Sequence, residues 1–171
     1  WIPNQVGNDR KMNLDDILDI IKNKSKEDIA LITRAYQFAQ SAHQGQERFS
    51  GEPYFAHSFE VGKNLAEMNL DARTIAAGLL HDVCEDGHAT EKEIEKEFGA
   101  DIAFLVRGVT KLGKLKYRGE ERYRENLRKM VLAMAEDIRV VLIKLADRLH
   151  NTQTLAYVPP HKRKRIADET L

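Results

Sequence analysis

Apolar residues recur every three or four positions along most of the chain. Residues at that spacing lie on one face of an α-helix, so the pattern predicts amphipathic helices. Prolines and β-branched runs are few, which gives no reason to expect a strand. The clearest apolar stripes are Ile32, Ala35, Tyr36, Ala39 and Ala42; Val61, Leu65 and Met68; Ala72, Ile75, Ala76, Leu79 and Val83; and Ile102, Leu105, Val106 and Val109. The pattern predicts an all-α fold of about eight helices.

Residues that favour helix ends fall where these stripes begin and stop. Ser or Thr followed three residues later by an acidic side chain matches a capping box, and proline suits a first helical position. Glycine is common just after a helix. The positions predicted to begin or end helices are Ser25 with Asp28, Pro53, Asp71, Thr90 with Glu93, and Gly99. Two segments, residues 44–52 and 113–119, are predicted to be loops.

Composition is that of an ordinary soluble globular protein, with 42% hydrophobic and 32% charged residues. A formal net charge of +0 gives no general attraction to nucleic acid or to membranes. The aliphatic run from Val140 to Ile143 is far shorter than the roughly 20 residues that span a bilayer. The single cysteine, Cys84, excludes an intrachain disulfide and predicts a reducing, cytoplasmic location.

The chain is expected to form one domain, because 171 residues can enclose one sizeable core. It does not begin with Met, and Met12 precedes the helix start at Asn13. Residues 1–11 are therefore interpreted as a linker, an upstream extension or a cloning remnant, and residues 12–171 as the domain. The chain stops at Leu171 within a helical pattern, which favours a piece cut from a longer protein.

Four polar residues, at three places on otherwise apolar helices, are candidates for chemistry. His81 and Asp82 are adjacent and follow the apolar run at residues 76–80; neighbours on a helix point about 100° apart, so other helices would have to complete a site. Alone, the pair is weak evidence for a site, and an ordinary helix-end cap is the favoured interpretation. Asp147 lies on a mostly apolar helix, at helical spacing with Lys144, Arg148, Asn151 and Thr154; a wet helix face is the alternative. His57 shares a face with Val61, and alone would more often be a core histidine.

Taken together, these positions supply two imidazoles and two carboxylates. Nitrogen and oxygen ligands of this kind suit Mn²⁺, Fe²⁺ or Zn²⁺. Four protein ligands on a six-coordinate ion leave places for water and for a phosphate oxygen, as metal-assisted hydrolysis requires. The predicted ligands are His57, His81, Asp82 and Asp147.

Glu85 and Asp86 lie four residues after His81 and Asp82. If the helix continued, both carboxylates would lie one turn beyond the metal ligands, where one could take a proton from water and the other orient it. Because Gly87 indicates that the helix ends nearby, acidic residues in a loop are the alternative. Cys84 is interpreted as a small packing residue.

The order of these ligands resembles the pattern of the HD superfamily. Four segments narrow the resemblance to the N-terminal hydrolase domain of RelA/SpoT-homologue proteins, which make and destroy the alarmone (p)ppGpp. The similarity covers the chain from about Leu14 to Leu171, and its motifs are GQERFSGEPYFAH, AAGLLHDVCED, FLVRGVTKLGKL and EDIRVVLIKLADRLHN.

The resemblance implies an HD-domain helical bundle that removes the 3′-pyrophosphate of ppGpp or pppGpp, giving GDP or GTP. It implies one Mn²⁺ ion, ahead of Fe²⁺ and Zn²⁺, on the four ligands above, and Glu85 with Asp86 as the catalytic pair. It also implies a synthetase domain that follows in the full-length protein. Residues implied to bind the substrate are Arg48, which would pack on the guanine ring, Asn151, Ser50, Lys144 and Thr154.

One position departs from the family. A basic residue usually follows the loop arginine, and here that position is Phe49, so one phosphate or base contact is expected to be missing while the reaction is unchanged. All metal positions and the Glu85–Asp86 pair are present, which predicts an active hydrolase.

Three alternatives stay open at this point. The chain could be another HD phosphohydrolase, acting on nucleoside monophosphates or dNTPs, or a non-catalytic domain that binds the nucleotide and regulates. The basic run at residues 161–165 could bind nucleic acid, but the acidic Asp168 and Glu169 that follow favour a solvated helix face. Neither a nucleic acid nor a membrane partner is therefore expected.

Overall fold

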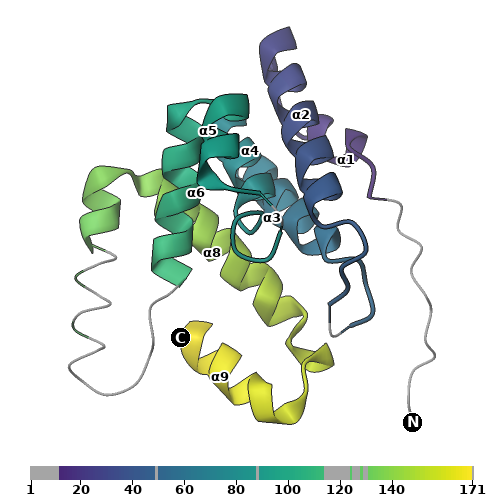
Figure 1. The fold of residues 1–171 in the computed structure, drawn as a ribbon, viewed down its shortest axis with the longest axis vertical. Coiled ribbons are helices and arrows are strands. Elements are labelled where there is room, and N and C mark those ends of the chain that lie inside the picture. The colour runs from purple at the N-terminus through teal and green to yellow at the C-terminus, as the bar shows by residue number, and fades with distance from the viewer. Residues whose placement is uncertain are drawn as a thin grey trace.

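The computed structural model describes residues 12–48, 50–87, 89–113, 124, 128 and 131–170, and every regular element among them is helical (Figure 1). The all-α prediction is confirmed. The elements are α1 (Asp15–Leu18), α2 (Lys26–Ala42), α3 (Phe55–Glu67), α4 (Ala72–Leu80), α5 (Glu91–Phe98), α6 (Ala100–Gly113), α8 (Ile138–Gln153), the 3-10 helix η1 (Leu155–Tyr157) and α9 (Pro160–Thr170). Phe49, the proposed linker at residues 1–11 and most of the predicted loop at 113–119 lie outside the described residues.

Most of the predicted helix ends are confirmed. Both capping boxes form, with Ser25 and Thr90 each accepting from the backbone three residues later. Asp71 caps α4 by accepting from two backbone N–H groups, and Gly99, at a φ of 86°, ends α5. The prediction for Pro53 is wrong. α3 begins at Phe55, two residues after the proline. Pro53 instead forms an isolated β-bridge with Glu47, which closes the 44–52 loop.

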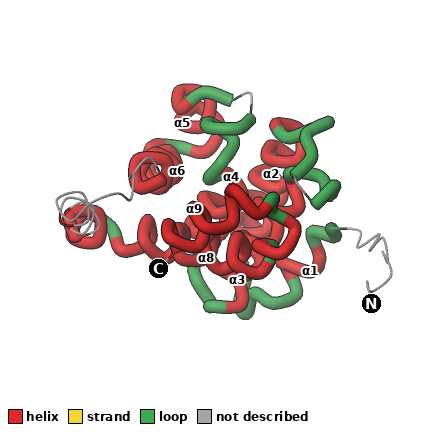
Figure 2. The backbone as a smooth tube through the Cα atoms, turned by 90° about the horizontal axis from the view of Figure 1, so that it is seen from below, coloured by secondary structure: helices red, strands yellow, loops and turns green. Residues whose placement is uncertain are grey.

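Helix α4 lies at the centre of the fold and contacts α2, α3, α6 and α8 (Figures 1 and 2). Every residue of α4 except Arg73 is buried, so this helix is apolar on nearly all sides. Two glycines permit its close approach to α3: a Cβ on Gly62 would come within 2.8 Å of Leu79, and a Cβ on Gly78 would overlap Leu65. Because α3 and α8 also contact each other, α3, α4 and α8 converge on one region of the core.

The helix that carries His81 does not continue to Glu85 and Asp86, as it would have to if both carboxylates lay one helical turn beyond the metal ligands. α4 ends at Leu80 with His81 as its C-cap, and residues 81–86 are turns. The backbone N–H groups of Glu85 and Asp86 both donate to the carbonyl oxygen of Asp82, at 3.1 and 2.9 Å. The loop alternative is therefore the observed one, and its turns are closed by hydrogen bonds between residues three and four apart.

No helix in the described ranges is both long and apolar enough to cross a membrane.

Candidate metal centre

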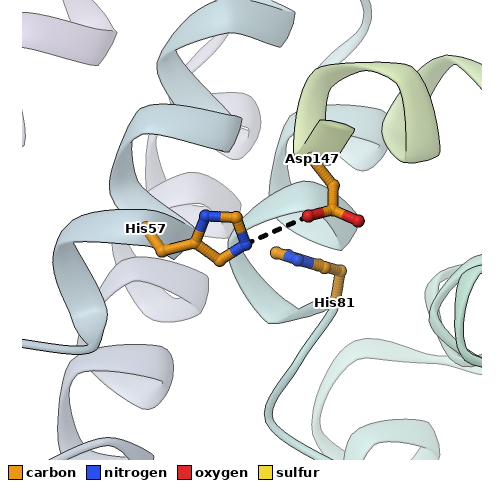
Figure 3. Close-up of side chains that lie close together, drawn as sticks. All are labelled: His57, His81 and Asp147. Atoms are coloured by element: carbon orange, nitrogen blue, oxygen red, sulfur yellow. Dashed lines mark ion pairs between the residues drawn. The ribbon is translucent and has the colours of Figure 1, made fainter. Parts of the chain in front are cut away.

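Three helices bring the side chains of His57, His81 and Asp147 together (Figure 3). One possible ligand atom from each lies within 4.8 Å of the others. All three residues are buried, with exposed fractions of 2%, 1% and 4%. Buried histidines and carboxylates occur where they are paired or bind a metal, so this cluster needs a chemical explanation.

The sequence around each residue explains its burial. His57 lies one turn before Val61 on the buried face of α3. His81 caps the C-terminus of the apolar helix α4. Asp147 follows Ala146 on the face of α8 that also buries Ile143. Because the apolar faces of α3, α4 and α8 pack against one another, the three polar side chains lie together in the core.

Asp82 closes the set. Its Oδ2 lies 3.5 Å from His57 Nε2, and its Oδ1 lies 3.2 Å from His81 Nε2. His57 Nε2 also lies 3.2 Å from Asp147 Oδ1. The structure thus brings together all four side chains that the sequence singled out as metal ligands.

His81 shows how well the cluster fits a cation. Its Nδ1 lies 2.8 Å from the carbonyl oxygen of Gly78, which can only accept, so the Nδ1 carries the proton. The buried Nε2 makes no hydrogen bond, although Asp82 Oδ1 is close to it. In a neutral His81, a lone pair would face a carboxylate, which is repulsive unless a cation or a proton lies between them. The donor set therefore suits a divalent metal ion bound by nitrogen and oxygen.

The pKa values of the cluster follow the same electrostatics. Burial opposes a charge on His81, but Asp82 and Asp147 outweigh it and raise the pKa of His81 to about 9. Burial would raise the pKa of both carboxyl groups, yet the neighbouring histidines hold the pKa of Asp82 and of Asp147 well below the usual range. Burial lowers the pKa of His57. In the metal-free protein, the two carboxylates therefore favour the protonated, positively charged form of His81.

Tyr54 connects the cluster to one of the two predicted catalytic carboxylates. Its hydroxyl lies 2.7 Å from Asp86 Oδ2 and 3.2 Å from Asp82 Oδ2. Burial and the charges of these two carboxylates raise the pKa of Tyr54, so the hydroxyl stays protonated and donates. Gln46 also donates to the backbone oxygen of Asp86, at 2.6 Å. Asp86, although exposed, is thereby oriented next to the ligand cluster, and Glu85 is exposed on the same turns.

Three of the predicted substrate residues meet beside the cluster, two on α8 and one in the 44–52 loop. Lys144 Nζ lies 2.7 Å from Asp147 Oδ2, and Asn151 donates to Asp147 Oδ1 at 2.5 Å. Arg48, from the 44–52 loop, donates to Asn151 Oδ1 at 2.8 Å. The loop and the helix are therefore joined at the edge of the buried cluster.

The other two predicted substrate residues make local contacts. The Ser50 hydroxyl donates to Glu52 Oε2 at 3.1 Å, within the loop. Thr154 is the C-cap of α8, and its hydroxyl donates to the backbone oxygen of His150 at 3.0 Å. Both hydroxyls bond to their own segment in this structure and do not reach the ligand cluster.

Sequence reasoning missed two residues of the site, Tyr54 and His150. His150 is 7% exposed, and its Nδ1 lies 2.8 Å from His57 Nδ1 and 3.2 Å from Arg48 Nη1. A signal was available, because His150 follows Asp147 by three residues and so shares its helix face. For Tyr54, which precedes His57 by three residues, its position ahead of the helix gave no such indication.

Comparison with known proteins places these features in a family. The profile described as the HD domain matches residues 35–171. The chain is 54% identical over 147 residues to the bifunctional (p)ppGpp synthase/hydrolase SpoT of Escherichia coli strain K12, a match covering 85% of this chain and 21% of that protein. It is 50% identical over 161 residues to the guanosine-3′,5′-bis(diphosphate) 3′-pyrophosphohydrolase of Vibrio cholerae serotype O1, covering 91% and 23%.

A solved structure agrees at the level of the fold. It is described as a metazoan ortholog of SpoT that hydrolyzes ppGpp and plays a role in starvation responses. The TM-score is 0.65 at 28% sequence identity, over 87% of this chain and 84% of the other. By contrast, this chain spans only about a fifth of the length of the bacterial relatives.

Proposed function

This chain belongs to the HD domain family, and we propose that it hydrolyses the 3′-pyrophosphate of guanosine 3′,5′-bis(diphosphate) or its pentaphosphate, releasing GDP or GTP and pyrophosphate. The observation that carries the proposal is the buried cluster in which His81 Nε2, which makes no hydrogen bond, lies 3.2 Å from a carboxylate oxygen of Asp82. Relatives at 50–54% identity are named for this hydrolysis.

We propose that His57, His81, Asp82 and Asp147 hold one Mn²⁺ ion. When bound, such an ion supplies Lewis acidity that activates water and polarises a phosphate oxygen. The ligand set also fits Fe²⁺ and Zn²⁺, and Mn²⁺ is favoured because the sequence motifs resemble a family that uses it. The hydrogen bond from His81 Nδ1 to Gly78 supports the ligand role, because a second partner on the far nitrogen is usual for a metal-bound histidine.

For proton transfer we propose the carboxylates of Glu85 and Asp86. Asp86 is held by Tyr54, whose hydroxyl also contacts Asp82, so one donor positions a general base relative to a metal ligand. A general base must lie within hydrogen-bond reach of the water it deprotonates, and this fixed link keeps Asp86 near the ligands. Glu85, on the same turns, is proposed to orient the water.

For the nucleotide we propose the side that carries the 44–52 loop and α8. Lys144 adds a positive charge at the ligand cluster, where phosphate oxygens would approach. The planar guanidinium of Arg48 is suited to stacking on a purine, and its bond to Asn151 holds it beside α8. Ser50 and Thr154 are proposed to line the same pocket, from the loop and from the end of α8.

The test is incubation of the purified chain with ppGpp and Mn²⁺, with GDP and pyrophosphate separated by chromatography. The Asp82→Ala variant is the matched control, since it removes one proposed ligand. Release of pyrophosphate by the parent alone supports the proposal. Hydrolysis of nucleoside monophosphates or dNTPs in place of ppGpp would show a different HD phosphohydrolase. Tight ppGpp binding without turnover, in folded and metal-loaded protein, would show a regulatory binding domain.

A further inference from the structure

His150 lies between His57, a proposed metal ligand, and Arg48 of the 44–52 loop, and the proposed function assigns it no role. We propose that His150 is a positioning residue: it accepts a hydrogen bond from Nδ1–H of His57, so that the Nε2 lone pair of His57 faces the metal, and Arg48 fixes the direction of that bond. This inference rests on the metal centre of the proposed function and does not depend on the identity of the substrate.

The contacts form a chain of three side chains. Arg48 Nη1 lies 3.2 Å from His150 Nδ1, which lies 2.8 Å from His57 Nδ1. On the other edge of the His57 ring, Nε2 lies 3.2 Å from Asp147 Oδ1 and 3.5 Å from Asp82 Oδ2. The two nitrogens of His57 therefore face different partners, one the histidine and the other the carboxylates.

The position of one proton decides what His57 can do. A neutral imidazole has one N–H and one lone pair. If the proton is on Nε2, it points at Asp147 and no lone pair is left on that side for a metal. If the proton is on Nδ1, it points at His150, and the Nε2 lone pair points at the carboxylate side of the cluster. Only the second form can bind an ion together with Asp82 and Asp147.

Arg48 selects that second form. A guanidinium only donates hydrogen bonds, so the His150 Nδ1 next to Arg48 Nη1 must present its lone pair. A His150 with its proton on Nδ1 would oppose N–H to N–H. His150 Nδ1 then shares its one lone pair between two donors, Arg48 Nη1 at 3.2 Å and His57 Nδ1 at 2.8 Å, so His57 Nδ1 carries the proton. Arg48 is itself anchored by the amide oxygen of Asn151, at 2.8 Å.

In both histidines of the cluster, Nδ1 donates a hydrogen bond and Nε2 is left for the metal, but the acceptors differ. His81 Nδ1 donates to a backbone carbonyl, that of Gly78, which cannot change its role. His57 Nδ1 donates to a side chain whose tautomer depends on a residue of the 44–52 loop. The geometry therefore links the loop proposed to hold the base with the orientation of one metal ligand.

The variants His150→Asn and His150→Leu form a matched pair. Both side chains branch at Cγ and leave a similar space, but only asparagine places an oxygen where Nδ1 was. We expect Mn²⁺ affinity, measured by calorimetry on chelator-treated protein, to fall by roughly 10–100-fold in His150→Leu and much less in His150→Asn, as for outer partners of metal-bound histidines. Circular dichroism checks that both variants are folded.

A second readout is the position of the ring protons. In ¹⁵N-histidine-labelled protein loaded with diamagnetic Zn²⁺, which the same ligands fit, long-range proton–nitrogen NMR shows which ring nitrogen carries the proton. We expect the proton on Nδ1 in His57 and on Nε2 in His150. The Nδ1 proton of His57 should exchange with water faster in His150→Leu than in His150→Asn, because only asparagine keeps an acceptor for it.

Two outcomes would overturn the inference. One is a His57 proton on Nε2 in the parent protein, and the other is equal Mn²⁺ affinity of the asparagine and leucine variants. Failure to hydrolyse ppGpp, with the expected tautomers and affinities in place, would reject the proposed substrate and leave the role of His150 intact. A parent that binds no Mn²⁺ rejects the metal centre and this inference together.

Discussion

At the scale of single residues, Tyr54 has the clearest separable role, because one hydroxyl contacts both Asp86 and Asp82. Tyr54→Phe keeps the ring and its stacking against His43, whose centroid lies 4.8 Å away, and removes only the hydrogen bonds. We expect kcat for ppGpp to fall by roughly 10-fold, equivalent to about 1.4 kcal/mol, as Asp86 loses its fixed orientation. Mn²⁺ affinity should change little.

Steady-state kinetics with calorimetry of Mn²⁺ binding would measure this effect. Tyr157→Phe is the matched control, because Tyr157 is 64% exposed on η1 and should give parental rates. An unchanged kcat in Tyr54→Phe would mean that Asp86 does not depend on the tyrosine for its position.

His81 predicts how metal binding depends on pH. Its pKa is raised to about 9 in the metal-free protein, so below that pH a proton occupies the ring nitrogen that would bind the ion. Binding must displace this proton, and we expect the apparent Mn²⁺ affinity to rise as pH increases toward 9, with about one proton released from His81 per ion.

Calorimetry between pH 6 and pH 8.5 in buffers of different ionisation enthalpy would count the released protons, with affinity changing by about tenfold per unit for one proton. The variant His81→Asn is the control, since it lacks the titrating ring. Affinity independent of pH in the parent would contradict protonation of His81 in the empty cluster.

At the scale of elements, the contact between α3 and α4 sets the position of two proposed ligands. A Cβ on Gly78 would overlap the side chain of Leu65, so Gly78→Ala must push the two helices apart. Overpacking of this kind typically costs about 1–3 kcal/mol, against a gain of up to about 1 kcal/mol from helix propensity. We expect a net loss of unfolding free energy, measured by urea denaturation.

The double variant Gly78→Ala/Leu65→Val removes the methyl group that causes the overlap, and it should be more stable than Gly78→Ala alone. Because Gly78 O accepts from His81, the single variant should also weaken Mn²⁺ binding. Equal stability of Gly78→Ala and the parent would show that the contact between α3 and α4 can accommodate a Cβ at position 78.

At the scale of the whole molecule, the metal should hold α3, α4 and α8 together, since its proposed ligands come from these helices and the turn after α4. A ligand that binds only the folded state stabilises it, by about 2.7 kcal/mol at a concentration 100 times its Kd. We expect Mn²⁺ to raise the Tm and chelator to reverse the change. The variant His81→Ala should gain much less.

Stability of the metal-free protein should depend on pH in two windows. The raised pKa of His81 means that its contribution is fully present below its ordinary pKa of 6.5 and is lost as pH rises toward 9. The depressed pKa values of Asp82 and Asp147 mean that their contribution is present above 3.8 and is lost as pH falls below it. Denaturation across pH would measure both losses, and Mn²⁺ should abolish the one at alkaline pH.

The prediction that a synthetase domain follows in the full-length protein, like the cytoplasmic location, stays a prediction from the sequence resemblance. This chain spans about a fifth of the length of those bacterial relatives.

By itself, the sequence determined the features that depend on neighbours along the chain. The capping boxes at Ser25 and Thr90 involve residues three apart, and apolar spacing within one helix predicts its buried face, so the all-α fold followed from local rules. The four proposed metal ligands were also predicted before the structure. Each position alone had an ordinary alternative, and the prediction came from their combination, which the resemblance of motifs then supported.

Tertiary structure decided what depends on residues far apart. The contact of His57 with His150 joins positions 93 residues apart, and that of Arg48 with Asn151 joins positions 103 apart. A single helix cannot show which of its polar side chains will face a partner, because that is set by how neighbouring helices pack, and only there does His150 become distinct from any other histidine on a helix.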